Sequence, residues 1–310
     1  MKTNQLNRLA IVCAAFAFTP ICPAALTFTG IHVFGDSLSD SGNVALATGG
    51  GRPGVDYYQG RYSNGPVWVE QLAAGYLGLV APIPSLAGGS NYAFAGAASA
   101  GGSGGVPSAM DQTLGLISAG GTFGSTDLVV LWIGANDFLL EGVTDPGVPI
   151  ANIVSSIEAL AGAGARTILV PNLPDLSDTP AISLLGNPTA SAGMHALTVG
   201  FNTILDAQLA SLRTSLGIDL VGLDIFSLGK DINADPFAYG LTNATDGAYL
   251  IGDIANANDY VYWDGVHPTA AMHSIIADAG ARALGVPEPS ATMFLAVGVF
   301  GILFQRRRAS

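Results

Sequence analysis

The architecture of this chain follows from ten residues, Phe34-Gly35-Asp36-Ser37-Leu38-Ser39-Asp40-Ser41-Gly42-Asn43. They continue a short apolar run at residues 31–34, which predicts a β-strand, and they end in small polar residues that favour a turn. In open α/β sheets, ligands bind at the carboxyl edge of the strands. A strand that stops at Gly-Asp-Ser therefore places the hydroxyl of Ser37 at this edge. The backbone N–H groups of the following turn can face a developing oxyanion there.

A second segment, Trp263-Asp264-Gly265-Val266-His267-Pro268-Thr269, supplies the partners that a serine nucleophile needs. A serine hydroxyl is a weak nucleophile until a base takes its proton, and an imidazole is the usual base. A carboxylate bonded to the other ring nitrogen fixes the tautomer and stabilises the imidazolium. Asp264 and His267 lie three residues apart in a turn that contains glycine, so one loop can deliver both groups. We expect Ser37 to be the nucleophile, His267 the general base and acid, and Asp264 the residue that orients His267.

Two further segments offer donors for an oxyanion hole. A continuous apolar run at residues 128–133 predicts a strand buried on both faces of a parallel sheet. It leads to Asn136, whose side-chain amide would lie at the same edge as Ser37, although Asn136 could instead cap the helix after its strand. The second segment is the Gly-rich stretch 88–98, in which the N–H of Gly96 could be the other donor because no side chain blocks its approach.

The candidate residues resemble those of a known family. The four residues for which the SGNH (GDSL) hydrolase family is named match, in chain order, Ser37, Gly96, Asn136 and His267, and the family's Asp-x-x-His block matches Asp264. A single block is weak, since Gly-Asp-Ser-Leu occurs by chance, but four blocks in the right order are specific.

The resemblance covers about residues 30–285, and the segments 60–68 and 164–175 resemble further blocks of the GDSL lipase/esterase branch. It implies a flavodoxin-like three-layer α/β/α sandwich with a central parallel sheet, the SGNH-hydrolase fold. It also implies an enzyme that hydrolyses ester bonds with no cofactor. We expect no metal site, because the chain has only four histidines and no cysteine beyond residue 22.

Apolar strands alternate with helical stretches, which predicts a parallel sheet with helices on both faces. Two Gly-rich stretches, residues 45–60 and 96–105, are expected at the active-site edge, either to shape an acyl pocket or as plain surface loops. Residues 231–260 are expected to be irregular and to form the rim of the site. Strands are expected at residues 31–34, near 91–94, and at 128–133, 167–170 and 220–223, and helices at 66–76, 150–163, 192–216 and 269–284.

Other polar residues of these segments are expected to have supporting roles. Asp36 should fix its own turn by accepting nearby N–H groups, and Asp137 should be structural. The other histidines are expected at the surface or in packing, and four polar residues are candidates for lining the pocket. The histidines are His32, His195 and His273, and the pocket candidates are Asp40, Asn43, Arg61 and Asn64.

Residues 1–25 have the pattern of a secretory signal peptide. Two basic residues precede an apolar run at residues 9–18, and cleavage is expected after Ala24 or Ala25. Cys22 raises the alternative of a lipoprotein, but Thr-Pro-Ile before it is a poor lipobox. The pattern therefore predicts export.

Residues 286–310 resemble a sorting signal. Pro287-Glu288-Pro289 precedes an apolar segment at residues 291–304, and three arginines follow at 306–308. This resembles the PEP-CTERM signal, which an exosortase is thought to recognise and cleave in certain Gram-negative bacteria. The apolar segment has 14 residues, short of the ~20 that span a bilayer comfortably. A simple C-terminal membrane anchor is the alternative. The tail thus predicts a short transmembrane helix, cytoplasmic arginines and transient membrane anchoring.

The expected hydrolase domain, residues 26–285, is strongly acidic. It holds 6 basic and 22 acidic residues, a net charge of −16. This charge argues against nucleic acid as a partner, since phosphate contacts depend on Lys and Arg, and against nonspecific attraction to anionic lipid. Both cysteines, Cys13 and Cys22, lie in the signal region, so the mature domain has no disulfide.

Together these patterns predict an exported serine esterase or lipase. It would act on a small-molecule, lipid or acylated-carbohydrate ester in the periplasm, at the cell surface or in the extracellular matrix of a Gram-negative bacterium. Two alternatives remain open: an exopolysaccharide O-deacetylase, and a catalytically idle surface or matrix binding protein on the same fold. The acyl chain length and the alcohol portion of the substrate do not follow from the sequence.

Overall fold

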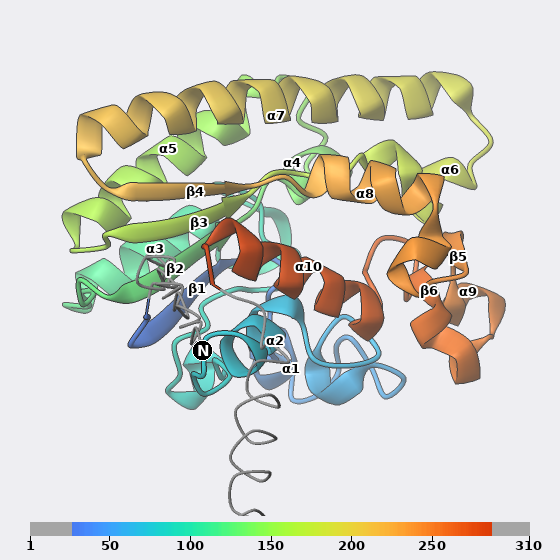
Figure 1. The fold of residues 1–310 in the computed structure, drawn as a ribbon, viewed down its shortest axis with the longest axis horizontal. Helices are drawn as coiled ribbons and strands as arrows, with labels where there is room; N and C mark the ends of the chain where they lie inside the picture. The colour runs from blue at the N-terminus through green and yellow to red at the C-terminus, as the bar shows by residue number, and fades with distance from the viewer. Residues whose placement is uncertain (1–26, 287–310) are drawn as a thin grey trace, which may run out of the picture.

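A central sheet of four parallel strands, in the order β1-β2-β3-β4, organises the computed structural model, which describes residues 27–286 (Figure 1). The expected signal peptide and sorting tail lie outside the described residues. Among residues 27–286, no helix is long and apolar enough to cross a membrane. The strands are β1 (Gly30–Gly35), β2 (Asp127–Trp132), β3 (Thr167–Pro171) and β4 (Asp219–Leu223).

Side chains of β2 show why the sheet needs cover on both faces. Val129 and Leu131 belong to one buried cluster, whereas Leu128, Val130 and Trp132 belong to another. Successive strand residues point to opposite faces, so a continuous apolar run fills both clusters at once. The three-layer α/β/α fold follows from this pattern and confirms the expected fold class.

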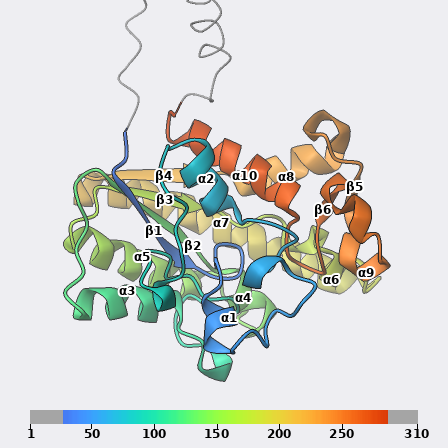
Figure 2. The same cartoon turned by 90° about the horizontal axis from the view of Figure 1, so that it is seen from below.

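Helices supply the cover, three on one face and two on the other. Figure 2 shows the sheet between α2 and α10 on one side and α3 and α5 on the other, and α7 packs against α5. The long α7 is capped at its start by Asn187, which accepts the N–H groups of Thr189 and Ala190. The covering helices are α2 (Trp68–Gly75), α3 (Ala109–Ser118), α5 (Gly147–Gly162), α7 (Pro188–Leu216) and α10 (Ala270–Ala283).

The strand expected near residues 91–94 is reduced to isolated parallel bridges of Asn91, one with Val33 and one with Pro84. The segment still runs along β1, because Tyr92 N donates to Val33 O at 2.7 Å and Phe94 N donates to Gly35 O at 3.1 Å. It therefore holds the position outside β1, and it carries the chain to Gly96 at the carboxyl edge.

Short elements surround this edge. The region 231–260 is more ordered than expected, since it contains the end of α8, β5 and α9. Strand β5 pairs in parallel with β6 in a separate two-stranded sheet. The short elements are α1 (Asn43–Ala47), α4 (Ala135–Leu139), α6 (Pro180–Ser183), α8 (Ile225–Ala234), α9 (Ala248–Ile251), β5 (Asn243–Gly247) and β6 (Tyr260–Tyr262).

Candidate active site

Ser37 follows the end of β1 in a tightly held turn. The side chain of Gln112 accepts from Gly35 N and donates to Gly35 O, each at 2.9 Å. A Cβ atom on Gly35 would lie 2.4 Å from the carbonyl oxygen of Trp132, so only glycine allows this approach of β1 to β2. Asp36 then accepts the N–H of Leu38 at 3.0 Å, as expected of a turn aspartate. Ser37 is thereby fixed at the carboxyl edge of the sheet.

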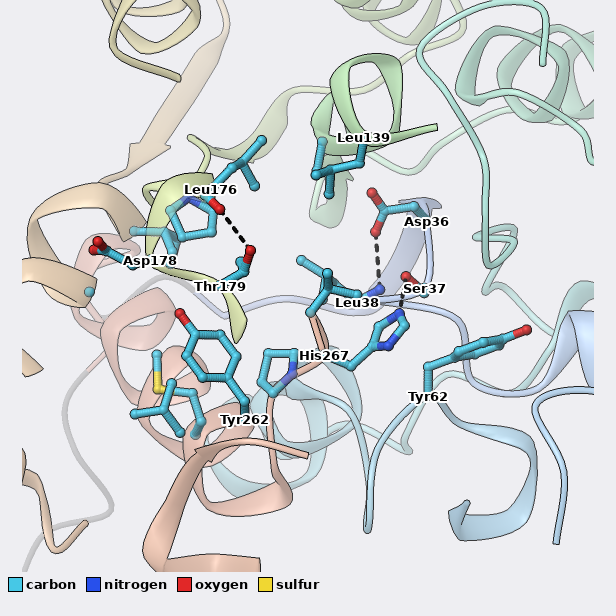
Figure 3. Close-up of a pocket in the computed structure, with 18 of the residues that line it drawn as sticks. Asp36, Ser37, Leu38, Tyr62, Leu139, Leu176, Asp178, Thr179, Tyr262 and His267 are labelled. Atoms are coloured by element: carbon cyan, nitrogen blue, oxygen red, sulfur yellow. Dashed lines mark hydrogen bonds between the residues drawn. The ribbon is translucent and has the colours of Figure 1, made fainter. Parts of the chain in front are cut away.

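Three side chains from opposite ends of the domain form one hydrogen-bonded chain. The Oγ atom of Ser37 lies 2.9 Å from Nε2 of His267 (Figure 3). Nδ1 of His267 lies 2.7 Å from Oδ2 and 2.9 Å from Oδ1 of Asp264. With Nδ1 protonated toward the carboxylate, Nε2 is free to accept the serine proton.

The carboxylate of Asp264 is held in its ionised form. Burial opposes this, but hydrogen bonds and the charge of His267 outweigh it, and they hold the pKa of Asp264 at about 2. The backbone N–H groups of Val266 and His267 donate to Oδ1 at 2.9 and 2.8 Å. The spacing of three residues therefore lets the loop fold back on its own carboxylate.

A tyrosine that was not predicted from the sequence also donates a hydrogen bond to this carboxylate. The hydroxyl of Tyr57 donates to Oδ2 of Asp264 at 2.7 Å, across 207 residues of chain. Burial and the charge of Asp264 raise the pKa of Tyr57, so its hydroxyl remains a donor. Tyr57 also packs edge-on against Trp263, with ring centroids 6.0 Å apart. Its position within the Gly-rich stretch 45–60 gave no signal of this contact.

The segment 60–68 holds the histidine loop in place. Ser63 Oγ donates to the carbonyl of Pro268 at 2.8 Å, and the side chain of Asn64 accepts the N–H of Ala270 at 2.7 Å. The ring of Tyr62 lies beside His267, with centroids 5.0 Å apart. This block, matched in the sequence only by resemblance, thus fixes the loop that carries the imidazole.

Both candidate oxyanion residues border the same cavity as Ser37. Gly96 adopts φ +86°, a conformation that favours glycine, and within residues 27–286 neither its N–H nor that of Ser37 has a protein acceptor. The amide of Asn136 donates one hydrogen to Ala97 O at 2.9 Å, which leaves its second hydrogen for a ligand. The helix-cap alternative for Asn136 is wrong, because the N-cap of α4 is Gly134.

Buried Asp40 joins the turn that contains Ser37 to the loop that contains Gly96. Its carboxylate accepts from the N–H groups of Gly42, Asn43 and Val44 on one side. It accepts from the N–H of Ala95 at 2.9 Å on the other. Burial raises the pKa of Asp40, and these donors oppose that effect. Asp40 therefore sets the distance between the serine and the glycine amide.

The sequence expectations for pocket-lining residues were wrong at four positions. Asp40, Asn43, Arg61 and Asn64 do not line the cavity that contains Ser37. They make supporting contacts outside the cavity. The guanidinium of Arg61, for example, binds the carboxylate of Glu70 through two nitrogens, at 2.6 and 3.2 Å.

The other histidines do not reach Ser37. His273 is buried, and burial together with the charge of His267 lowers its pKa to about 3. Its Nδ1 accepts the N–H of Trp68 at 3.2 Å. His195 pairs with Asp175, and His32 lies near Asp127. These are packing and surface roles, as expected. Within the described part of the chain, no cluster of three or more histidine, cysteine or acidic side chains could hold a metal ion.

A cavity of about 290 Å³ extends from the serine along the carboxyl edge of the sheet. Figure 3 shows Ser37 and His267 at one end, Asp178 and Tyr262 at the other, and Leu38 between them. Within the described residues, each of the two Gly-rich stretches contributes one residue to the cavity wall, Arg52 and Gly96. The walls are mainly apolar and include Leu38, Trp132, Leu139, Leu176, Val261 and Met272.

A serine, an imidazole and a carboxylate joined in this way beside an apolar cavity are typical of serine hydrolases. The model of the GDSL-like lipase/acylhydrolase family matches residues 31–279. The chain therefore belongs to this family of ester-hydrolysing enzymes.

Individual relatives agree with this assignment. A phosphatidylcholine-sterol acyltransferase of Aeromonas hydrophila is 30% identical over 229 residues, which cover 72% of this chain and 66% of that protein. A GDSL esterase/lipase of Arabidopsis thaliana is 28% identical over 323 residues, covering 83% of each chain. The chain thus spans just under two thirds of the first relative. Among solved structures, a carbohydrate acetylesterase of Sinorhizobium meliloti matches with a TM-score of 0.47 and 15% identity, over 82% of this chain and 96% of that one.

The protonation of Asp36 makes the stability of the fold depend on pH. Burial raises the pKa of this carboxyl to about 7, whereas an unfolded aspartate titrates near 3.9. Between these values the folded chain holds a proton that the unfolded chain has lost, so the contribution of Asp36 to stability falls as pH rises from about 4 to 7. We expect Asp36→Asn to remove this loss. Urea unfolding at pH 4.5 and 8 should show the variant gaining a few kcal/mol relative to wild type at the higher pH. A difference between the proteins that stays constant with pH would contradict the assignment.

Proposed function

We propose that this protein is a serine esterase that hydrolyses carboxylic esters through an acyl-enzyme on Ser37. The observation that carries this proposal is the continuous chain from Ser37 Oγ through His267 to Asp264, with its 2.9 and 2.7 Å contacts. Membership of the GDSL-like lipase/acylhydrolase family supports the reaction class.

In the first half-reaction, Ser37 Oγ attacks the ester carbonyl carbon while His267 Nε2 takes its proton. The carbonyl π electrons move to oxygen, and Asp264 stabilises the imidazolium that forms. The free N–H groups of Ser37 and Gly96 and the second amide hydrogen of Asn136 are the donors for this oxyanion. Collapse of the tetrahedral intermediate breaks the ester C–O bond, and the departing alcohol takes the proton from His267.

The second half-reaction releases the acyl group. A water molecule gives a proton to His267 Nε2 as its oxygen attacks the acyl carbon. The same donors hold the second oxyanion. Collapse returns the proton to Ser37 Oγ and frees the carboxylic acid, so the enzyme is restored without a cofactor.

Hydrolysis of p-nitrophenyl esters by residues 26–285 tests the proposal. Ser37→Ala should abolish turnover, and Asp264→Asn should lower kcat by about 10³–10⁴, because the wrong tautomer of His267 is then favoured. Turnover that survives Ser37→Ala would refute the serine mechanism. An optimum at acetate would favour the exopolysaccharide O-deacetylase alternative. Tight polysaccharide binding by a wild-type protein without turnover would instead favour the idle binding protein.

Tyr57 is proposed as a residue that positions and tunes Asp264. In Tyr57→Phe, the carboxylate loses one hydrogen-bond donor, and more of its negative charge faces His267. We expect kcat/KM to fall about tenfold, because Asp264 is then less firmly held and orients His267 less well. The midpoint of its rise with pH should move up by about half a unit, since the imidazolium is better stabilised.

Tyr249→Phe is the matched control for this prediction. Tyr249 packs against Tyr57 in the same aromatic cluster, but its hydroxyl donates to Asp56 at 3.2 Å instead of to Asp264. The control should keep the wild-type pH profile. If both variants moved the midpoint equally, the effect would belong to the aromatic cluster and not to the bond with Asp264.

We also propose that the protein is exported and loses both ends. The pattern of residues 1–25 and the Pro-Glu-Pro segment with its arginines support this proposal. An exosortase-type enzyme would process the tail after transient anchoring in the inner membrane. Intact mass and N-terminal sequencing of the protein from its native envelope and medium should show a start at Ala25 or Leu26 and no Arg306–Arg308. A cytoplasmic protein with both ends intact would contradict it.

A further inference from the structure

One wall of the cavity has a gap in its row of side chains. Helix α8 borders the cavity with Ile225, Gly229, Ile232 and Asn233, at positions i, i+4, i+7 and i+8. These positions share one face of a helix, so a side chain at position 229 would project into the cavity. Glycine leaves that space empty.

Nothing in the local backbone requires glycine at this position. Gly229 lies inside α8 with ordinary helical geometry, and a Cβ atom built on it would meet no atom within 4 Å. Glycine in a helix interior is unfavourable compared with alanine. The missing side chain at position 229 therefore makes the cavity larger.

The cavity matches an acyl chain better than an alcohol such as a sugar. It begins at Ser37, Gly96 and Asn136, the groups that would hold the ester carbonyl, and it continues between apolar walls. A sugar there would lose hydrogen bonds to water without replacement, whereas methylene groups gain from burial. The apolar walls and the volume of about 290 Å³ thus favour a chain of several methylene groups.

Charged and polar groups mark the far end. Asp178 borders the cavity there, and its carboxylate accepts from Lys230 at 2.9 Å and from Asn233 at 2.8 Å. The hydroxyl of Tyr262 points to the same end in Figure 3. An acyl chain long enough to reach these groups would place methylene groups against a carboxylate and its hydrogen-bond donors, so the favourable length has an upper limit.

We propose that this cavity takes a medium-chain acyl group and that Gly229 sets the length it accepts. This proposal rests on the proposed esterase function. It assigns the substrate as an ester of a medium-chain fatty acid, and it makes Gly229 a specificity-determining residue.

The test compares p-nitrophenyl acetate, octanoate, decanoate and palmitate, each below its micelle concentration. For wild type, kcat/KM for octanoate or decanoate should exceed that for acetate by about 10²-fold, because several methylene groups are buried. Palmitate should be the poorer of the long substrates. Gly229→Leu should lower kcat/KM for decanoate at least tenfold and leave acetate within about twofold.

Gly193→Leu provides the matched control. Gly193 lies exposed in α7, away from the cavity, and a Cβ atom there also meets nothing within 4 Å. It should keep the wild-type chain-length profile. Gly229→Ala, which favours the helix, should shift the optimum toward shorter chains by a smaller amount, and it replaces Gly229→Leu if that variant fails to fold. An acetate optimum in wild type, or an unchanged profile in the Gly229 variants, would overturn the proposal.

A binding measurement separates this inference from the catalytic one. Ser37→Ala should bind decanoate in isothermal titration, and Ser37→Ala/Gly229→Leu should bind it at least tenfold more weakly. Decanoate binding without any Ser37-dependent turnover in wild type would refute the esterase but keep the cavity assignment. Ser37-dependent turnover without decanoate binding would support the esterase and refute the cavity assignment.

Discussion

The buried carboxylate of Asp40 is the interaction on which the site depends. Two loops, one after β1 and one after the segment beside it, must present N–H groups to the same point in space. Asp40 binds amides of both loops at once. A buried carboxylate without donors would be very costly, so the two loops can pack here only when both supply their N–H groups. Charge burial thus enforces the spacing between Ser37 and Gly96.

Contacts between distant segments also hold the loop that carries His267. The histidine loop would be free to move if only the Ser37 contact held it. Instead, Asp264 accepts hydrogen bonds from amides of its own loop. Ser63 donates to the carbonyl of Pro268, and Tyr57, from the Gly-rich stretch, donates to the carboxylate of Asp264. These contacts come from two regions far apart in the sequence, and the imidazole is held by all of them together. The site is therefore preorganised by its neighbours, as electrostatic catalysis requires.

The four strands of the sheet and the convergence of the five candidate site residues at its edge could be predicted from the sequence, because these signals are local. The catalytic roles of the five residues stay predictions. Apolar runs define strands, and parallel strands bring their carboxyl ends to one edge. Ser37 and Asn136 were placed there for that reason. Tyr57 and Asp40 could not be given their contacts in this way, since each joins residues far apart along the chain. The cavity walls were missed because no helix was predicted at residues 225–234, where α8 lies, and residues 231–260 were expected to be irregular. The cap alternative for Asn136 failed because the N-cap of α4 is Gly134, two residues earlier.

The separation of Ser37 from His267, 230 residues along the chain, has a consequence for the order of folding. Contacts so distant in sequence form late, because a long loop must close first. A chain that emerges with its N-terminus first presents Ser37 early and His267 almost last. Under the proposed mechanism no partly made chain can attack an ester, so activity begins only when the domain is complete.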